Sequence, residues 1–209
     1  MPICRRKILI CGGVLALWVW GFPAPVLGED VSAGAGKFIE TLVDKATSAL
    51  AVDGIPRPQR VDRFHILLND HFAVETIGQF VLGRYWRKAT EAERREYLKL
   101  FEDLIVETYV DRFTKYTGED VLSVVKTVAK GPRDIVVYSR IKGLEGGPPV
   151  LVNWRVQAKS GAYKIVDVMV EGISMGLTQR SEFASVIRKN GGKIEGLLEE
   201  LRRKLETGA

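Results

Sequence analysis

The sequence predicts an α+β fold: an antiparallel four-stranded or slightly larger sheet, curved and wrapped by helices, with an apolar pocket between sheet and helices. Two observations lead to this class. Residues 31–116 and 177–205 place apolar side chains at helical spacing, whereas residues 121–170 alternate apolar and polar positions with a period of two. Glycine- and proline-containing turns divide the alternating region into short segments, so successive strands run antiparallel.

Residues 1–28 have the pattern of a cleavable secretory signal. A basic start at residues 5–7 precedes an apolar stretch at residues 8–21, and proline and small residues follow. The apolar stretch is shorter than the ~20 residues of a comfortable membrane-spanning helix, although an uncleaved anchor is the alternative. We therefore expect residues 29–209 to form a single secreted domain.

The composition of the mature segment argues against several classes of function. The whole chain has 31 basic and 26 acidic residues, and three of the basic ones lie in the signal, which leaves 28 against 26 and a net charge of +2. A charge so close to neutral does not indicate a nucleic-acid partner. Cys4 and Cys11 both lie in the signal, so the mature segment has no thiol for catalysis, metal binding or a disulfide.

Start and stop signals bound the predicted helices. Pro56 and Pro58 end one helix and begin the next. Thr90 and Glu93 form a capping box, in which the Thr90 side chain accepts from the Glu93 amide and the Glu93 carboxylate reaches back. The predicted helices are 31–52, 61–82 with a break near His71, 90–116, and 177–205 with an interruption at 190–192.

Four strands follow from the period of two, and turns rich in glycine and proline separate them. Because the connections are short, we expect an antiparallel meander. We expect its concave face to enclose a ligand cavity against the long helix that begins at Thr90. The predicted strands are 121–129, 134–142, 149–158 and 163–170.

Residues 172–176 read Gly-Ile-Ser-Met-Gly and match the G-x-S-x-G pattern of a nucleophilic serine between a strand and a helix. Such a serine needs a general base, and in that enzyme family the histidine follows the serine. Here His65 and His71 both lie far upstream of Ser174. We therefore expect a tight turn, in which the glycines permit unusual backbone angles.

Other polar groupings are equally weak as catalytic or metal sites. Asp167 and Glu171 are four apart on one strand and could act as an acid–base pair, but such pairs are more often solvated. His65 and His71 are six apart, which suits neither one helix face nor a metal site. We expect no catalytic residue, metal or cofactor. A basic helix face, solvated or used to dock anionic headgroups or an acidic partner, comprises Lys88, Arg94, Arg95 and Lys99.

Two separated blocks carry a family resemblance. Residues 80–90 read Phe-Val-Leu-Gly-Arg-Tyr-Trp-Arg-Lys-Ala-Thr, and residues 167–175 read Asp-Val-Met-Val-Glu-Gly-Ile-Ser-Met, followed by Arg180 and Phe183. On these blocks the chain resembles the MlaC family, also called the toluene-tolerance family, the periplasmic phospholipid-binding component of the system that maintains outer-membrane lipid asymmetry. The resemblance covers roughly residues 37–205.

The resemblance implies a periplasmic lipid carrier that is not an enzyme. Its cargo would be a phospholipid, or a hopanoid as in some relatives, with the chains in a deep apolar pocket. Its partners would be an inner-membrane ABC transporter complex and an outer-membrane lipoprotein complex. Arg180 is a candidate headgroup or structural partner. By apolar face and motif, we expect the lipid to contact Phe80, Val81, Tyr85, Phe101, Ile105, Tyr109, Val137, Trp154, Val168 and Val170.

Two other functions stay open from the residues alone. A small periplasmic hydrolase or isomerase would use Asp167, Glu171 or Ser174, and an envelope interaction protein would need no pocket. Detection of lipid that co-purifies with the protein would favour the carrier over the interaction protein. Loss of a measured turnover in an Asp167→Asn or Ser174→Ala variant would support the enzyme.

Overall fold

The structure is a computed structural model that describes residues 27–52, 54–115, 121–143, 146–159 and 161–207. The predicted signal lies outside these ranges except for its last two residues. Within them the chain is an α+β protein, as expected. The helices are α1 (Leu27–Leu50), α2 (Arg57–His71), α3 (Val74–Leu82), α4 (Glu91–Tyr109), α5 (Met175–Lys189) and α6 (Glu195–Thr207), with 3₁₀ turns η1 (Gly83–Tyr85) and η2 (Val110–Lys115).

The sheet confirms the predicted meander. Its strands are β1 (Leu122–Ala129), β2 (Asp134–Ile141), β3 (Val150–Lys159), β4 (Ala162–Val170) and β5 (Ile173–Ser174), antiparallel and in chain order across the sheet. The register brings Val137, Trp154 and Val168 side by side on one face. This face carries the apolar side chains of the alternating pattern, and the short strand β5 extends it by one strand that we did not predict.

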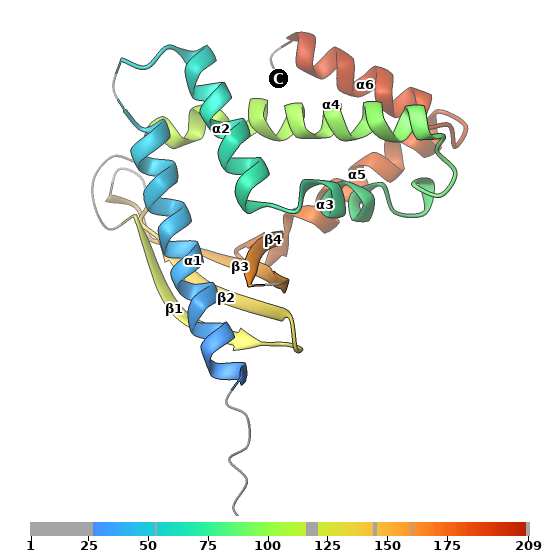
Figure 1. Ribbon diagram of the computed structural model, residues 1–209. Coiled ribbons are helices and arrows are strands. Elements are labelled where there is room, and N and C mark those ends of the chain that lie inside the picture. The colour runs from blue at the N-terminus through green and yellow to red at the C-terminus, as the bar shows by residue number, and fades with distance from the viewer. Residues whose placement is uncertain (1–26, 53, 116–120, 144–145, 160, 208–209) are drawn as a thin grey trace, which may run out of the picture.

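Helix α1, rather than the long helix α4, packs along the sheet. It contacts β1, β2 and β3, while α4 packs on α6, α3 and α2. In Figure 1 the sheet lies below, α2 to α6 gather above it, and α1 runs along the sheet from its lower end up to the level of α2. The physical reason is the small side chains of α1: Ala35 is fully buried, and a Cβ added at Gly36 would lie 3.1 Å from the Thr127 methyl group. The expectation that the long helix faces the sheet was therefore wrong.

The upper helices have an aromatic core. Tyr97 of α4 stacks on Phe101 at 5.7 Å between ring centroids and meets Phe183 of α5 edge-on at 6.1 Å. The Tyr97 hydroxyl donates to the Gly78 carbonyl oxygen at 3.0 Å, which satisfies the one polar atom of this ring. Burial raises the pKa of Tyr97 well above its usual value, so the ring stays neutral at any physiological pH. Among the described helices, none is both long and apolar enough to cross a bilayer.

The capping box of α4 forms as the sequence predicts. The Glu93 amide donates to the Thr90 hydroxyl oxygen at 3.2 Å, and the Thr90 amide donates to the Glu93 carboxylate at 2.7 Å. Hydrogen bonds from the Thr90 amide, and then from its hydroxyl, lower the pKa of Glu93. We expect Thr90→Ala to lower the free energy of unfolding by about 1 kcal/mol at neutral pH, as measured by urea unfolding.

The charge of Glu93 gives this cap a pH dependence. Because its pKa is lower in the folded than in the unfolded chain, the charged form stabilises the fold above the unfolded value. Glutamine keeps the acceptor oxygen but not the charge. The difference in unfolding free energy between the wild type and Glu93→Gln should therefore be largest near neutrality and vanish as the pH falls through the folded pKa. A difference that grows on acidification would contradict this reading of the cap.

Candidate functional site

The apolar interior of the described residues is divided into three clusters. One lies among α3 to α6, a second between α1 and the sheet, and a third among α1, α2 and α4. Four half-buried side chains each pack against two clusters: Leu67 and Phe72 join the second to the third, and Val74 and Ile105 join the first to the third. We call these four residues the seam. They are apolar side chains inside the fold that protein atoms do not fully enclose.

The corner between α2 and α3 fixes the seam to the sheet. Phe72 ends α2 in an extended conformation, with φ −108° and ψ 148°, and forms a parallel bridge with Ile165 of β4. The Ala73 amide donates to the Ile165 carbonyl oxygen at 2.9 Å. The helix break predicted near His71 therefore has a structural role, because it carries the backbone from the helical layer to the sheet.

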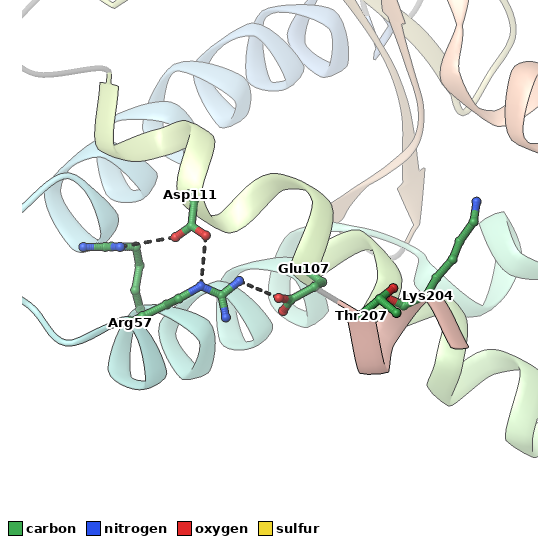
Figure 2. Close-up of polar contacts among 6 residues, drawn as sticks. Arg57, Glu107, Asp111, Lys204 and Thr207 are labelled. Carbon is green, nitrogen blue, oxygen red and sulfur yellow. Dashed lines mark hydrogen bonds and ion pairs between the residues drawn. The ribbon is translucent and has the colours of Figure 1, made fainter. Parts of the chain in front are cut away.

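Polar contacts hold the outer side of α2 against α4. Figure 2 shows Arg57, whose Nε donates to Asp111 at 2.9 Å and whose Nη2 donates to Glu107 at 2.6 Å. These bonds, first that to Asp111 and then that to Glu107, raise the pKa of Arg57. Further along α2, His65 lies 2.9 Å from the Glu102 carboxylate. Such exposed pairs add little stability, so they orient α2 while its apolar side faces the seam.

The structure does not gather the predicted lipid contacts around one space. Val81, Tyr85 and Phe101 are enclosed in the helical cluster, and Val137 and Trp154 in the sheet cluster. Ile105, Tyr109, Val168 and Val170 are half-buried, the first three packed against the clusters, and Phe80 is 37% exposed. Contact of any of them with lipid stays a prediction. The seam adds Leu67, Phe72 and Val74, which the sequence pattern alone does not distinguish from other apolar helix residues.

The sheet side of the interior contains one satisfied polar pair. The Trp154 indole donates to the Ser139 hydroxyl oxygen at 3.0 Å, and this hydroxyl donates to the Val152 carbonyl oxygen at 2.7 Å. Ser139 and Asp167 are the buried polar residues of the described chain, and Asp167 belongs to the cap described next. Among the described residues, the buried part of the sheet face that meets α1 therefore contains no charged side chain, which suits an apolar ligand.

Ser174 is a helix cap. It accepts from the Leu177 amide at 3.1 Å and donates its hydroxyl proton to Asp167 at 2.7 Å. The other Asp167 oxygen accepts from the Gly176 amide at 3.1 Å, so the carboxylate sits at the N-terminus of α5. Glu171 turns away and accepts from the Leu151 amide at 2.6 Å, so the two carboxylates do not pair. The tight turn expected at residues 172–176 is confirmed.

Both histidines have partners of their own. The Nδ1 atom of His71 lies 2.9 Å from the Leu67 carbonyl oxygen, and its ring stacks on Phe38 at 5.8 Å. His65 lies beside Glu102, as described above. In the described ranges no group of three or more histidine, cysteine or carboxylate side chains could hold a metal ion.

The two family-like blocks of the sequence meet at Arg180. Its guanidinium carbon lies 5.2 Å from the Phe80 ring centroid, a cation–π contact. Gly83 has φ +57°, and a Cβ there would come within 3.0 Å of the same guanidinium. The glycine of the first block therefore leaves room for the arginine of the second. The sequence suggested Arg180 as a structural or headgroup partner but did not show that its guanidinium lies against Gly83.

The fold and the seam define an α+β protein in which helices wrap an open antiparallel sheet and enclose a largely apolar interior with it. The fold resembles that of a phospholipid-binding protein from Ralstonia solanacearum in complex with a phospholipid: the TM-score is 0.73 at 23% identity, over 83% of this chain and 98% of that one. The chain belongs to the MlaC family, whose model matches residues 40–203. The resemblance seen in the two sequence blocks is thereby confirmed.

Two curated relatives match part of the chain. The intermembrane phospholipid transport system binding protein MlaC of Haemophilus influenzae is 25% identical over 132 residues, which cover 62% of this chain and 61% of that protein. The toluene tolerance protein ttg2D of Pseudomonas putida is 23% identical over 112 residues, 54% of this chain and 51% of that protein. The matched region thus spans less than two thirds of each relative.

Proposed function

We propose that the protein is a periplasmic lipid carrier, which holds a phospholipid with its acyl chains against the seam and passes it between membrane complexes. The observation that carries the proposal is the seam itself: half-buried apolar side chains where three clusters meet, in a member of the MlaC family. A phospholipid bound to the structurally similar R. solanacearum protein and the transport-system name of the H. influenzae relative support it.

The energetics of lipid transfer explain why a carrier is needed. Exposing acyl chains to water costs about 0.8 kcal/mol per methylene, or roughly 24 kcal/mol for about 30 methylenes. A protein interior that replaces the contacts of the bilayer makes transfer nearly neutral. Four of the predicted contacts are half-buried and so have surface left to offer a lipid: Ile105, Tyr109, Val168 and Val170.

The lipid is cargo, and the proposal assigns no catalytic residue and no cofactor. The polar groups that suggested an enzyme have structural partners. Ser174 and Asp167 cap the N-terminus of α5, and Glu171 accepts a hydrogen bond from β3. A hopanoid is the second candidate cargo, since an apolar seam discriminates poorly between acyl chains and a polycyclic hydrocarbon. Direction of transport then comes from an inner-membrane ABC transporter complex and an outer-membrane lipoprotein complex.

Native mass spectrometry of residues 29–209, secreted to the periplasm and purified without detergent, tests this function. We expect a discrete excess mass that extracts into organic solvent as a phospholipid. A hopanoid mass would keep the carrier and change its cargo. A clean apo mass, unchanged after incubation with phospholipid vesicles, would refute the carrier.

A further inference from the structure

Three large apolar side chains stay exposed around the start of α5, although the interior lies close by. Ile173 is 60% exposed, Leu177 is 58% exposed and Phe80 is 37% exposed. A Cβ added at Gly176 would lie 3.3 Å from the Phe80 ring, which places that ring beside the turn that carries the two aliphatic residues. We call these three residues, together with Arg180, the tip surface.

The backbone presents this surface outward. Glu171 and Gly172 have φ of +50° and +81°, which makes a sharp turn between β4 and β5. A Cβ on Gly172 would meet no atom within 4 Å, so the turn lies in open space. Ile173 follows it directly and pairs with Val170 at the sheet edge. The side chains of Ile173 and Leu177 are therefore exposed to solvent beside this open turn.

Arg180 brings a positive charge into the tip surface, where it lies over Phe80 and against Gly83. Arg84 follows that glycine in the chain, and the Arg84 guanidinium and the Lys88 ammonium lie 5.0 and 5.9 Å from the ring centroid of Tyr85. Arg84 donates to the Tyr85 hydroxyl at 3.0 Å. Throughout the ranges that the structure describes, none of these three cations forms an ion pair with a carboxylate.

The acidic groups beside the tip are already engaged. Asp167 is 7% exposed and accepts from Ser174 and Gly176 at the helix start. Glu171 accepts from the Leu151 amide. What remains available to a partner is exposed aliphatic surface bordered by unpaired positive charge, and this combination is complementary to an anionic surface with an apolar interior.

We propose that the tip surface docks the protein on the anionic face of a phospholipid bilayer. Ile173 and Leu177 insert among the upper acyl carbons, and Arg180 with its neighbouring cations bonds lipid phosphates. Ile173 and Leu177 are neither seam residues nor predicted lipid contacts, so their insertion can be tested separately from the holding of cargo. It adds direct contact with the bilayer to the proposed function, and it can fail while the carrier function stands.

Flotation of residues 29–209 with vesicles tests the docking. We expect the protein to float with vesicles of phosphatidylethanolamine and phosphatidylglycerol, and weakly or not at all with phosphatidylcholine alone. Replacing Ile173 and Leu177 together by serine should lower the partition coefficient about tenfold or more, because each buried methylene contributes about 0.8 kcal/mol. Arg180→Gln should lower it about fivefold, because a cation near an anionic surface contributes about 1 kcal/mol.

Matched controls separate docking through the tip surface from nonspecific adsorption to vesicles and from the binding of cargo lipid. Ile66, 61% exposed on α2, and Val125, 51% exposed on β1, changed together to serine remove similar aliphatic surface elsewhere and should leave binding unchanged. Lys45→Gln removes one exposed positive charge outside the tip surface and should also leave vesicle binding unchanged. The proposal would be overturned if the wild-type protein did not float with anionic vesicles, or if the tip variants floated as well as the wild type. Loss of co-purified lipid in the Ile173 and Leu177 double variant would also overturn it, since those two residues would then belong to the cargo site.

Discussion

Replacing Asp167 with alanine is expected to lower the free energy of unfolding by roughly 3 kcal/mol, because one buried and one half-buried donor lose their acceptor. The carboxylate is 7% exposed and accepts from the Ser174 hydroxyl and the Gly176 amide. It also places a negative charge at the N-terminus of α5, where the helix dipole favours it. Without it, the turn that joins β4 to α5 has no internal partner for these donors. Urea unfolding followed by circular dichroism measures the effect.

Glu171 provides the matched control for Asp167. Its carboxylate also accepts a backbone amide, that of Leu151, at 2.6 Å, but the residue is exposed and water replaces the bond. Glu171→Ala should therefore change stability by less than about 1 kcal/mol. Equal losses in the two variants would mean that Asp167 does not hold the start of α5. A turnover that disappears in Asp167→Asn without loss of stability would instead restore the enzyme hypothesis.

Local patterns in the sequence were sufficient for most elements of the fold. The four longer strands agree with the prediction to within about two residues at each end, because glycine and proline fix where each one turns. Thr90 and Glu93 located the start of α4 correctly. Strand β5 has two residues, too few for a period to show, and the start of α2 at Arg57 was missed because Pro58 was read as a boundary when it lies in the first turn.

The sequence pattern could not show which elements far apart in the chain pack against one another. An apolar stripe shows that a helix has a buried face but not what covers it, so α4 was placed on the sheet although α1 lies there. The same limit applies to the site. Phe101 and Ile105 lie on one stripe of α4, yet Phe101 is enclosed and Ile105 is half-buried where two clusters meet. Only tertiary contacts separate a plain core residue from one with surface left for a ligand.

Ile105→Trp is expected to lower lipid affinity roughly fiftyfold while leaving the fold intact. The added indole volume displaces about three methylenes of cargo from the seam, at about 0.8 kcal/mol each. In a well-packed core the same change would cost about 1–3 kcal/mol of stability. In a seam that lipid fills, the larger ring takes the place of the acyl chain and the apo protein keeps its stability. Native mass spectrometry for bound lipid and urea unfolding of the delipidated protein measure the two quantities.

The adjacent residue supplies the control. Val106 is 2% exposed and lies within the third cluster. As the next residue along α4, it projects about 100° around the helix axis from Ile105. Val106→Trp should destabilise the protein by about 1–3 kcal/mol, and the folded fraction should still carry lipid. If Ile105→Trp also destabilises the protein and keeps its lipid, Ile105 is ordinary core and the cargo lies elsewhere. Opposite responses of two neighbouring residues would locate the acyl chains on the Ile105 side of α4, where half-buried apolar surface meets the α2–α3 corner.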